Sequence, residues 1–354
     1  MRTLLQSTCF AVLLAGAGSA AGYDQAGHFY TVQALVRTAT VVMPDSDRRL
    51  LAVCAQLPDM ASDLDATALY FRAVTHSPWA WFRWATADKV DRDDIGRLVT
   101  VQRLLHALTG GLSLATQNVA IDKAKAWRDG YKPDAPIRER AVNLCAWGFS
   151  LHFLADALAH EKLDDAAVDR EKRHLYDTGK GHAFDMHDPD YVLCAERVPL
   201  TGTAVTCNFT TDANRRFAAW QNLWSKDSTN FLDGSFMPAP GRQALLAQIV
   251  SLGKDASSTN HWGEEKMREA LARDDPALKG IGAFIDAQAG DQKPCRTVLA
   301  RALATLQDLA PFGGLRCEAV WAAYRQSMKG ALKDDMFEAK GYYIDTPLML
   351  PQAP

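Results

Sequence analysis

The stretch HFLADALAH, residues 152–160, decides which fold and chemistry this chain is expected to have. His152, Asp156 and His160 follow one another at intervals of four, so on an α-helix they project to one side within an arc of about 80°. Apolar and small residues fill the intervals, and burying three polar groups among them is costly unless something satisfies them. Imidazole and carboxylate together suit zinc and its first-row neighbours. A core histidine bonded to an aspartate is the simpler alternative.

Helical periodicity also dominates the rest of the chain. Amphipathic helices are predicted at 28–43, 97–116, 138–160, 213–224, 241–252, 265–273 and 296–309. Residues 196–209 are the best candidate for a short hairpin. No repeat or linker divides the sequence, so we expect an all-α class with irregular loops, in one mainly helical domain over 23–354.

The first 22 residues have the pattern of a secretory signal peptide, with Arg2 before an apolar segment and small residues after it. Cleavage after Gly22 would make Tyr23 the new N-terminus, although Ala20 and Ala21 fit the small-residue rule equally well. No later run of about eighteen apolar residues follows. We therefore expect a soluble mature protein that is secreted or periplasmic.

Six cysteines remain after the predicted signal, and an even number in an oxidising compartment favours disulfides. Proximity in the sequence suggests two pairs, Cys194–Cys207 and Cys295–Cys317. Cys54 and Cys145 would then pair with each other or stay as buried thiols.

A second candidate stretch is AQLPDMASDLD, residues 55–65, which is followed by an isolated histidine. Asp59 comes directly after a proline, and His76 lies seventeen residues later, with Asp63 and Asp65 as nearby rivals. An aspartate after proline is also common as a turn or an N-cap, so this stretch alone does not define a metal site.

Two further stretches supply potential ligands. In YDQAGHFYTVQALV, residues 23–36, His28 opens an apolar helix close to the α-amine that cleavage would create at Tyr23. That amine has an unperturbed pKa near 8, so a metal could hold it in the neutral form; a partly buried histidine at a helix start is the alternative. The stretch GKGHAFDMHDPD contains His182, Asp185, His187, Asp188 and Asp190.

Taken in their order along the chain, the four stretches resemble the zinc-dependent phospholipase C superfamily, which includes the secreted single-strand nucleases. The resemblance covers residues 23–190 and implies an all-α enzyme that binds two or three zinc ions. One ion would be bound by Asp59, His76, His152 and Asp156. A second would be bound by the amine and carbonyl of Tyr23, by His28 and by a bridging Asp156. A third would be bound by His160, His182 and a later carboxylate, Asp185 or Asp190.

The chain departs from the family pattern at three places. Met186 stands where the family has its last carboxylate. The gap between Asp156 and His160 is shorter than usual and lacks a Gln–Pro step. Tyr23 replaces the usual N-terminal tryptophan. These departures concern the third ion above all.

The resemblance implies hydrolysis of phosphodiesters by metal-activated water, with Asp59 as the residue that orients the water. The aromatic segment HSPWAWFRW suggests Trp79, Trp81 and Arg83 as substrate-binding residues, although such aromatics are also common in cores. A net charge of −3 gives no broad electrostatic attraction for polyanions. We therefore expect a phospholipid or another phosphodiester, and a membrane surface as a partner, before nucleic acid.

Two alternatives stay open at this point. The first is a single-strand nuclease on the same scaffold. The second is a non-catalytic helical envelope protein in which a structural metal has closed coordination. No protein partner can be inferred from the sequence.

Overall fold

The computed structural model describes residues 27–38, 43–69, 93–160, 170–178, 268–269, 271–273, 275–289 and 293–332. These residues form helices and no strand, apart from an isolated antiparallel bridge between Leu112 and His174. Their buried apolar side chains form one connected cluster. The expected all-α class is therefore confirmed for the described residues, which form a single domain, whereas the extent of this domain over 23–354 stays a prediction. The proposed hairpin at 196–209 and the proposed helices at 213–224 and 241–252 lie outside the described residues.

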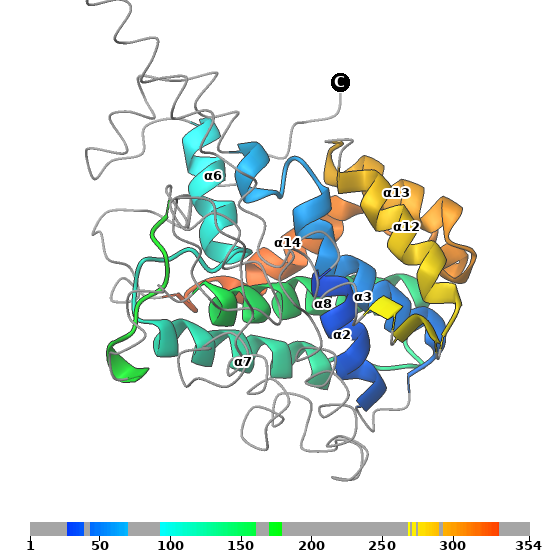
Figure 1. Cartoon of the computed structure of the whole chain (residues 1–354), viewed down its shortest axis with the longest axis horizontal. Coiled ribbons are helices and arrows are strands. Elements are labelled where there is room, and N and C mark those ends of the chain that lie inside the picture. The colour runs from blue at the N-terminus through cyan, green and yellow to red at the C-terminus, as the bar shows by residue number, and fades with distance from the viewer. Residues whose placement is uncertain are drawn as a thin grey trace, which may run out of the picture.

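Helix α8 (Ile137–Ala159) occupies the centre of the molecule (Figure 1). Its bounds agree closely with the helix predicted over 138–160. Every residue from 144 to 157 is buried, and a helix that is apolar on all sides must be covered on all sides. The covering helices are α3 (Asp45–Met60), α7 (Ser113–Asp129), α14 (Cys317–Met328) and, at one end, α2 (Gly27–Thr38). The potential ligands of α8 therefore lie deep in the core.

Helices α3 and α8 cross at Gly148. A Cβ on this residue would lie 2.7 Å from the carbonyl oxygen of Leu51 and 2.8 Å from the nitrogen of Ala55. Only glycine allows this approach of the two backbones. One turn earlier on α8, Cys145 forms a disulfide with Cys54, and their Cα atoms are 5.0 Å apart. Of the two alternatives that the sequence left open for these cysteines, the structure therefore shows a disulfide and not two buried thiols.

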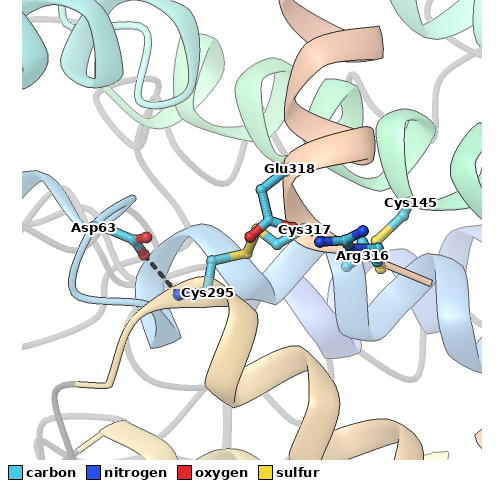
Figure 2. Close-up of a disulfide and its surroundings, with 7 residues drawn as sticks. Asp63, Cys145, Cys295, Arg316, Cys317 and Glu318 are labelled. Carbon is cyan, nitrogen blue, oxygen red and sulfur yellow. Dashed lines mark hydrogen bonds and ion pairs between the residues drawn. A yellow bond between two sulfur atoms is a disulfide. The ribbon is translucent and has the colours of Figure 1, made fainter. Parts of the chain in front are cut away.

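The second described disulfide, Cys295–Cys317, was predicted, and it joins the first residues of α13 (Cys295–Thr305) and α14. Beside it, the carboxylate of Asp63 accepts a hydrogen bond of 2.7 Å from the backbone N–H of Cys295 (Figure 2). These contacts fix the start of α13 against the loop that follows α3. The third predicted pair, Cys194–Cys207, lies outside the described residues.

The prediction of one helix over 97–116 is wrong. Helix α6 (Asp93–Leu104) ends early, and α7 starts only at Ser113. Between them Ala107 has a φ of 49° and Gly110 a φ of 70°, which no helix accommodates. Helices α3, α12 (Ala277–Ala289) and α14 were not predicted. The short 3-10 helices are η2 (Arg170–Lys172) and η5 (Gln307–Phe312).

Within the described part of the chain, no helix is both long enough and apolar enough to cross a membrane. The two described disulfides indicate an oxidising compartment. The predicted signal peptide, residues 1–22, lies outside the described residues, so the finer expectation of a secreted or periplasmic protein stays a prediction.

Candidate metal centre

Five histidine and aspartate side chains from three helices and one turn converge in the core. His28 is the second residue of α2, Asp59 lies in the last turn of α3, and His152 and Asp156 face inward from α8. His106 comes from the turn after α6. The side chain of Asp59 is 4% exposed, whereas the other four are fully buried.

These five residues form two groups that could hold a metal ion. The first is His28, Asp59 and His152, and the second is His106, His152 and Asp156; in each, the potential ligand atoms lie within 4.8 Å of one another. His28 Nε2 is 3.5 Å from Asp59 Oδ2 and 3.1 Å from Asp156 Oδ1. The two groups share His152. Since one imidazole nitrogen has one lone pair, His152 Nε2 can serve only one ion at a time.

Hydrogen bonds to backbone carbonyls fix the tautomers of three buried histidines. His152 Nδ1 donates to the carbonyl oxygen of Ala55 at 2.8 Å, and His106 Nε2 donates to that of Leu64 at 2.9 Å. His160 Nδ1 donates to the carbonyl oxygen of His106 at 2.7 Å. A carbonyl oxygen can only accept, so in each neutral ring the opposite nitrogen presents a lone pair.

As a result, three acceptor atoms face one another around Asp156. Its Oδ2 lies 3.1 Å from His106 Nδ1 and 3.3 Å from His152 Nε2, and the two nitrogens are 3.2 Å apart. Three acceptors at this range require a positive charge between them, which a proton or a metal ion can supply. A tetrahedral ion with bonds of about 2.0–2.1 Å keeps its ligands about 3.3 Å apart. The donor set and its spacing therefore fit a zinc-type ion.

The protonation states follow from burial and from the charges within the cluster. Burial raises the pKa of Asp156, but His152, His160 and His28 outweigh it and hold this pKa well below its usual value. Burial, with His28 nearby, lowers the pKa of His152 to about 3, and burial also lowers the pKa of His160. For His106, burial lowers the pKa, but the hydrogen bond and charge of Asp156 outweigh it and raise the pKa. Asp156 is thus favoured as the anion, and His152 and His160 are favoured as neutral imidazoles, which are the states in which these groups bind metals.

Gln56 connects two of the elements that supply the cluster. Its side-chain oxygen accepts a hydrogen bond of 3.0 Å from the backbone N–H of Phe29, next to His28. Its side-chain nitrogen donates to Asp59 Oδ2 at 3.0 Å. One amide therefore holds the start of α2 against the carboxylate of α3, a role typical of residues that support metal ligands.

The structure brings together four of the ligands predicted from the sequence, His28, Asp59, His152 and Asp156. His160 is also buried, and it contacts the cluster through the carbonyl of His106. The other predicted site residues lie outside the described part of the chain: Tyr23, His76, Trp79, Trp81, Arg83, His182, Asp185 and Asp190.

His106 lies in the centre of the cluster, although no role was predicted for it from the sequence. Its partners Leu64 and Asp156 are 42 and 50 positions away, so no local pattern identifies it. The only local signal is the Gly110–Gly111 pair soon after it, which indicates the end of a helix.

Comparison of the chain with protein-family models, curated proteins and solved structures gave no match. What the structure defines is an all-helical protein with buried His/Asp groups that could hold metal ions.

Proposed function

We propose that this chain is a metal-dependent phosphodiester hydrolase of the phospholipase C type that acts outside the cytoplasm. The observation that carries the proposal is the convergence of His28, Asp59, His152 and Asp156 in one buried cluster, although they lie on three helices and are separated by up to 128 positions, from 28 to 156. These are the residues that the resemblance to zinc-dependent phospholipases C assigns as ligands.

The ligand set suits hydrolysis at phosphorus. A bound divalent ion of this kind polarises a phosphoryl oxygen and makes a water molecule acidic enough to attack at neutral pH. The side chain of Asp59 is 4% exposed, whereas the other four side chains of the cluster are fully buried. Gln56 donates a hydrogen bond to Oδ2 of Asp59, and this contact would help to fix the carboxylate in position to orient an attacking water. No protein nucleophile is required, in agreement with a sequence that contains neither a G-x-S-x-G nor an HExxH motif.

The full site would use residues beyond the described ones. Tyr23, His76, His182 and either Asp185 or Asp190 would raise the number of bound ions to two or three. Trp79, Trp81 and Arg83 would bind the substrate. A phospholipid or a similar phosphodiester is favoured over nucleic acid because the chain has a net charge of −3 and so lacks the basic excess that holds polyanions.

A structural metal in a non-catalytic protein is the second candidate. The observation in its favour is burial, since His28, His152 and Asp156 have fully buried side chains. A structural zinc has four protein ligands and no position left for water. In that case the ion would contribute to folding and to nothing else.

Activity measurements with one isosteric variant separate these functions. The purified mature protein is assayed on phosphatidylcholine vesicles and on single-stranded DNA, with zinc and with a chelator. We expect zinc-dependent release of the phosphorylated headgroup, and a loss of roughly 100-fold or more in Asp59→Asn. Gln56 can still bond to the new amide oxygen, so this variant should fold. Asp122→Asn changes an exposed carboxylate on α7 and is the matched control.

Each outcome has one meaning. Cleavage of DNA alone would assign the nuclease function. Zinc binding without hydrolysis of either substrate, in wild type and variants alike, would contradict a hydrolase and favour the structural ion.

A further inference from the structure

We propose that His106 is a metal ligand through Nδ1, and that His106 Nδ1, His152 Nε2 and Asp156 Oδ2 bind the same ion. The proposal deepens the proposed function, because it concerns the same cluster, but it stands if the ion proves to be structural. Neither the sequence pattern nor the resemblance assigns a ligand at this position.

The backbone around His106 is held in an uncommon conformation. After α6 ends, the N–H of His106 bonds to the carbonyl oxygen of Val101 at 3.3 Å, five residues back instead of four. Ala107 then adopts a φ of 49°, a left-handed conformation that is unfavourable for a residue other than glycine. Backbone strain of this kind concentrates at functional sites, where the surrounding structure maintains it.

Contacts on several sides maintain this turn. The hydroxyl of Tyr324 on α14 donates a hydrogen bond of 2.5 Å to the carbonyl oxygen of Leu104. The N–H of Leu108 donates a hydrogen bond of 2.9 Å to the carbonyl oxygen of Gln102. The carbonyl of His106 accepts from His160 at 2.7 Å. These hydrogen bonds hold the backbone that carries the imidazole of His106 in one position.

The ring itself can face only one way. Nε2 donates to the carbonyl of Leu64, and the ring contacts that of His152 edge to face with centroids 4.9 Å apart. Nδ1 then lies 3.1 Å from Asp156 Oδ2 and 3.2 Å from His152 Nε2. A simple His–Asp pair accounts for the first of these distances. A proton on His106 Nδ1 would have to be shared with His152 Nε2 to account for the second distance, whereas an ion bound to all three atoms accounts for both distances directly.

A pair of isosteric substitutions tests this assignment. In His106→Gln the amide nitrogen can replace Nε2 and keep the bond to Leu64, while the ligand atom Nδ1 is lost. In His106→Asn an amide oxygen takes the approximate place of Nδ1, while the bond to Leu64 is lost. His174→Gln is the control, because His174 lies in the bridge to Leu112 and in neither ligand group.

Zinc is titrated into each chelator-treated, full-length mature protein in competition with a chromogenic chelator. We expect His106→Gln to lose roughly 100-fold in zinc affinity, His106→Asn to lose less, and His174→Gln to match the wild type. Circular dichroism should show the same helix content in all four proteins. Wild-type affinity in a folded His106→Gln variant would overturn the assignment.

A measurement on the wild type covers the case in which the variants do not fold. With 113Cd in place of zinc and 15N-labelled histidine, His106 Nδ1 should show a direct cadmium–nitrogen coupling. Coupling at His152 without coupling at His106 would overturn the proposal. If neither phosphodiester is hydrolysed but the coupling is present, the proposed function fails and the assignment of His106 holds.

Discussion

At the scale of single residues, the buried carboxyl of Asp63 connects the loop after α3 to the start of α13, and its ionised form is expected to destabilise the fold. It accepts the backbone N–H of Cys295 at the start of α13, and its residue surface is 6% exposed. Burial raises the pKa of Asp63, although the hydrogen bond from Cys295 partly offsets this. Because the folded pKa is raised, the stabilising contribution is complete below the unfolded pKa of about 3.9. It is lost as the pH rises through the folded pKa.

Asp63→Asn should therefore gain stability relative to the wild type as the pH rises from about 4 towards 7. The asparagine oxygen can still accept from Cys295, but it cannot ionise. The difference in free energy of unfolding should grow by about 1.4 kcal/mol for each unit by which the pKa is raised. Denaturant titrations at several pH values measure it. A difference that stays constant over this range would show that burial does not penalise the ionised carboxyl.

The site residues also show what a sequence can reveal at this scale. His152 and Asp156 could be predicted because their spacing of four residues is meaningful on one helix. His28 and Asp59 needed the family resemblance, since each has a common structural alternative. His106 could not be predicted, because its contacts with Asp156 and Leu64 exist only after α6, α8 and the loop that follows α3 pack together.

At the scale of elements, the crossing of α3 and α8 depends on Gly148. A methyl group there would meet backbone atoms of α3 at 2.7–2.9 Å, and backbone cannot move aside as a flexible side chain can. We expect Gly148→Ala to destabilise the protein by about 1–3 kcal/mol and to weaken zinc binding, because the same helices carry Asp59 and Asp156.

Gly280→Ala is the matched control for this substitution. Gly280 is an exposed residue of α12, and a Cβ there would meet nothing within 4 Å. Alanine should stabilise the helix by about 0.5–1 kcal/mol. Thermal unfolding of both variants measures the two effects. Equal stability of the two would mean that α3 and α8 are not in close contact at Gly148.

The helices differ in how well the sequence predicted them, and the reasons are physical. Helix α8 was predicted almost to its ends because its apolar run is long. Helix α3 was not predicted, and Asp59, for which a turn or an N-cap was the alternative, lies with Pro58 in the last turn of this helix. The prediction over 97–116 continued through the turn at Ala107, since only tertiary contacts hold an alanine at positive φ.

At the scale of the whole molecule, the cluster lies where distant parts of the chain meet. It joins α2, α3, α8 and the turn after α6, and the Cys54–Cys145 disulfide joins two of these same helices across 91 residues. Sequence spacing could not select that pair, because contact between α3 and α8 is a property of the packed core. An ion in the cluster would act as a second cross-link between elements that are not neighbours in the sequence.

Removal of the metal should therefore lower the stability of the entire fold. An ion that binds only the native state stabilises it by about 4 kcal/mol when its free concentration is 1,000 times the Kd. We expect a chelator to lower the thermal midpoint of the wild type by several degrees. It should leave that of Asp156→Asn unchanged, since this variant lacks the carboxylate common to His28, His106 and His152. Scanning calorimetry of both proteins, zinc-loaded and chelator-treated, makes the comparison. Identical midpoints for the two wild-type samples would contradict an ion that bridges these helices.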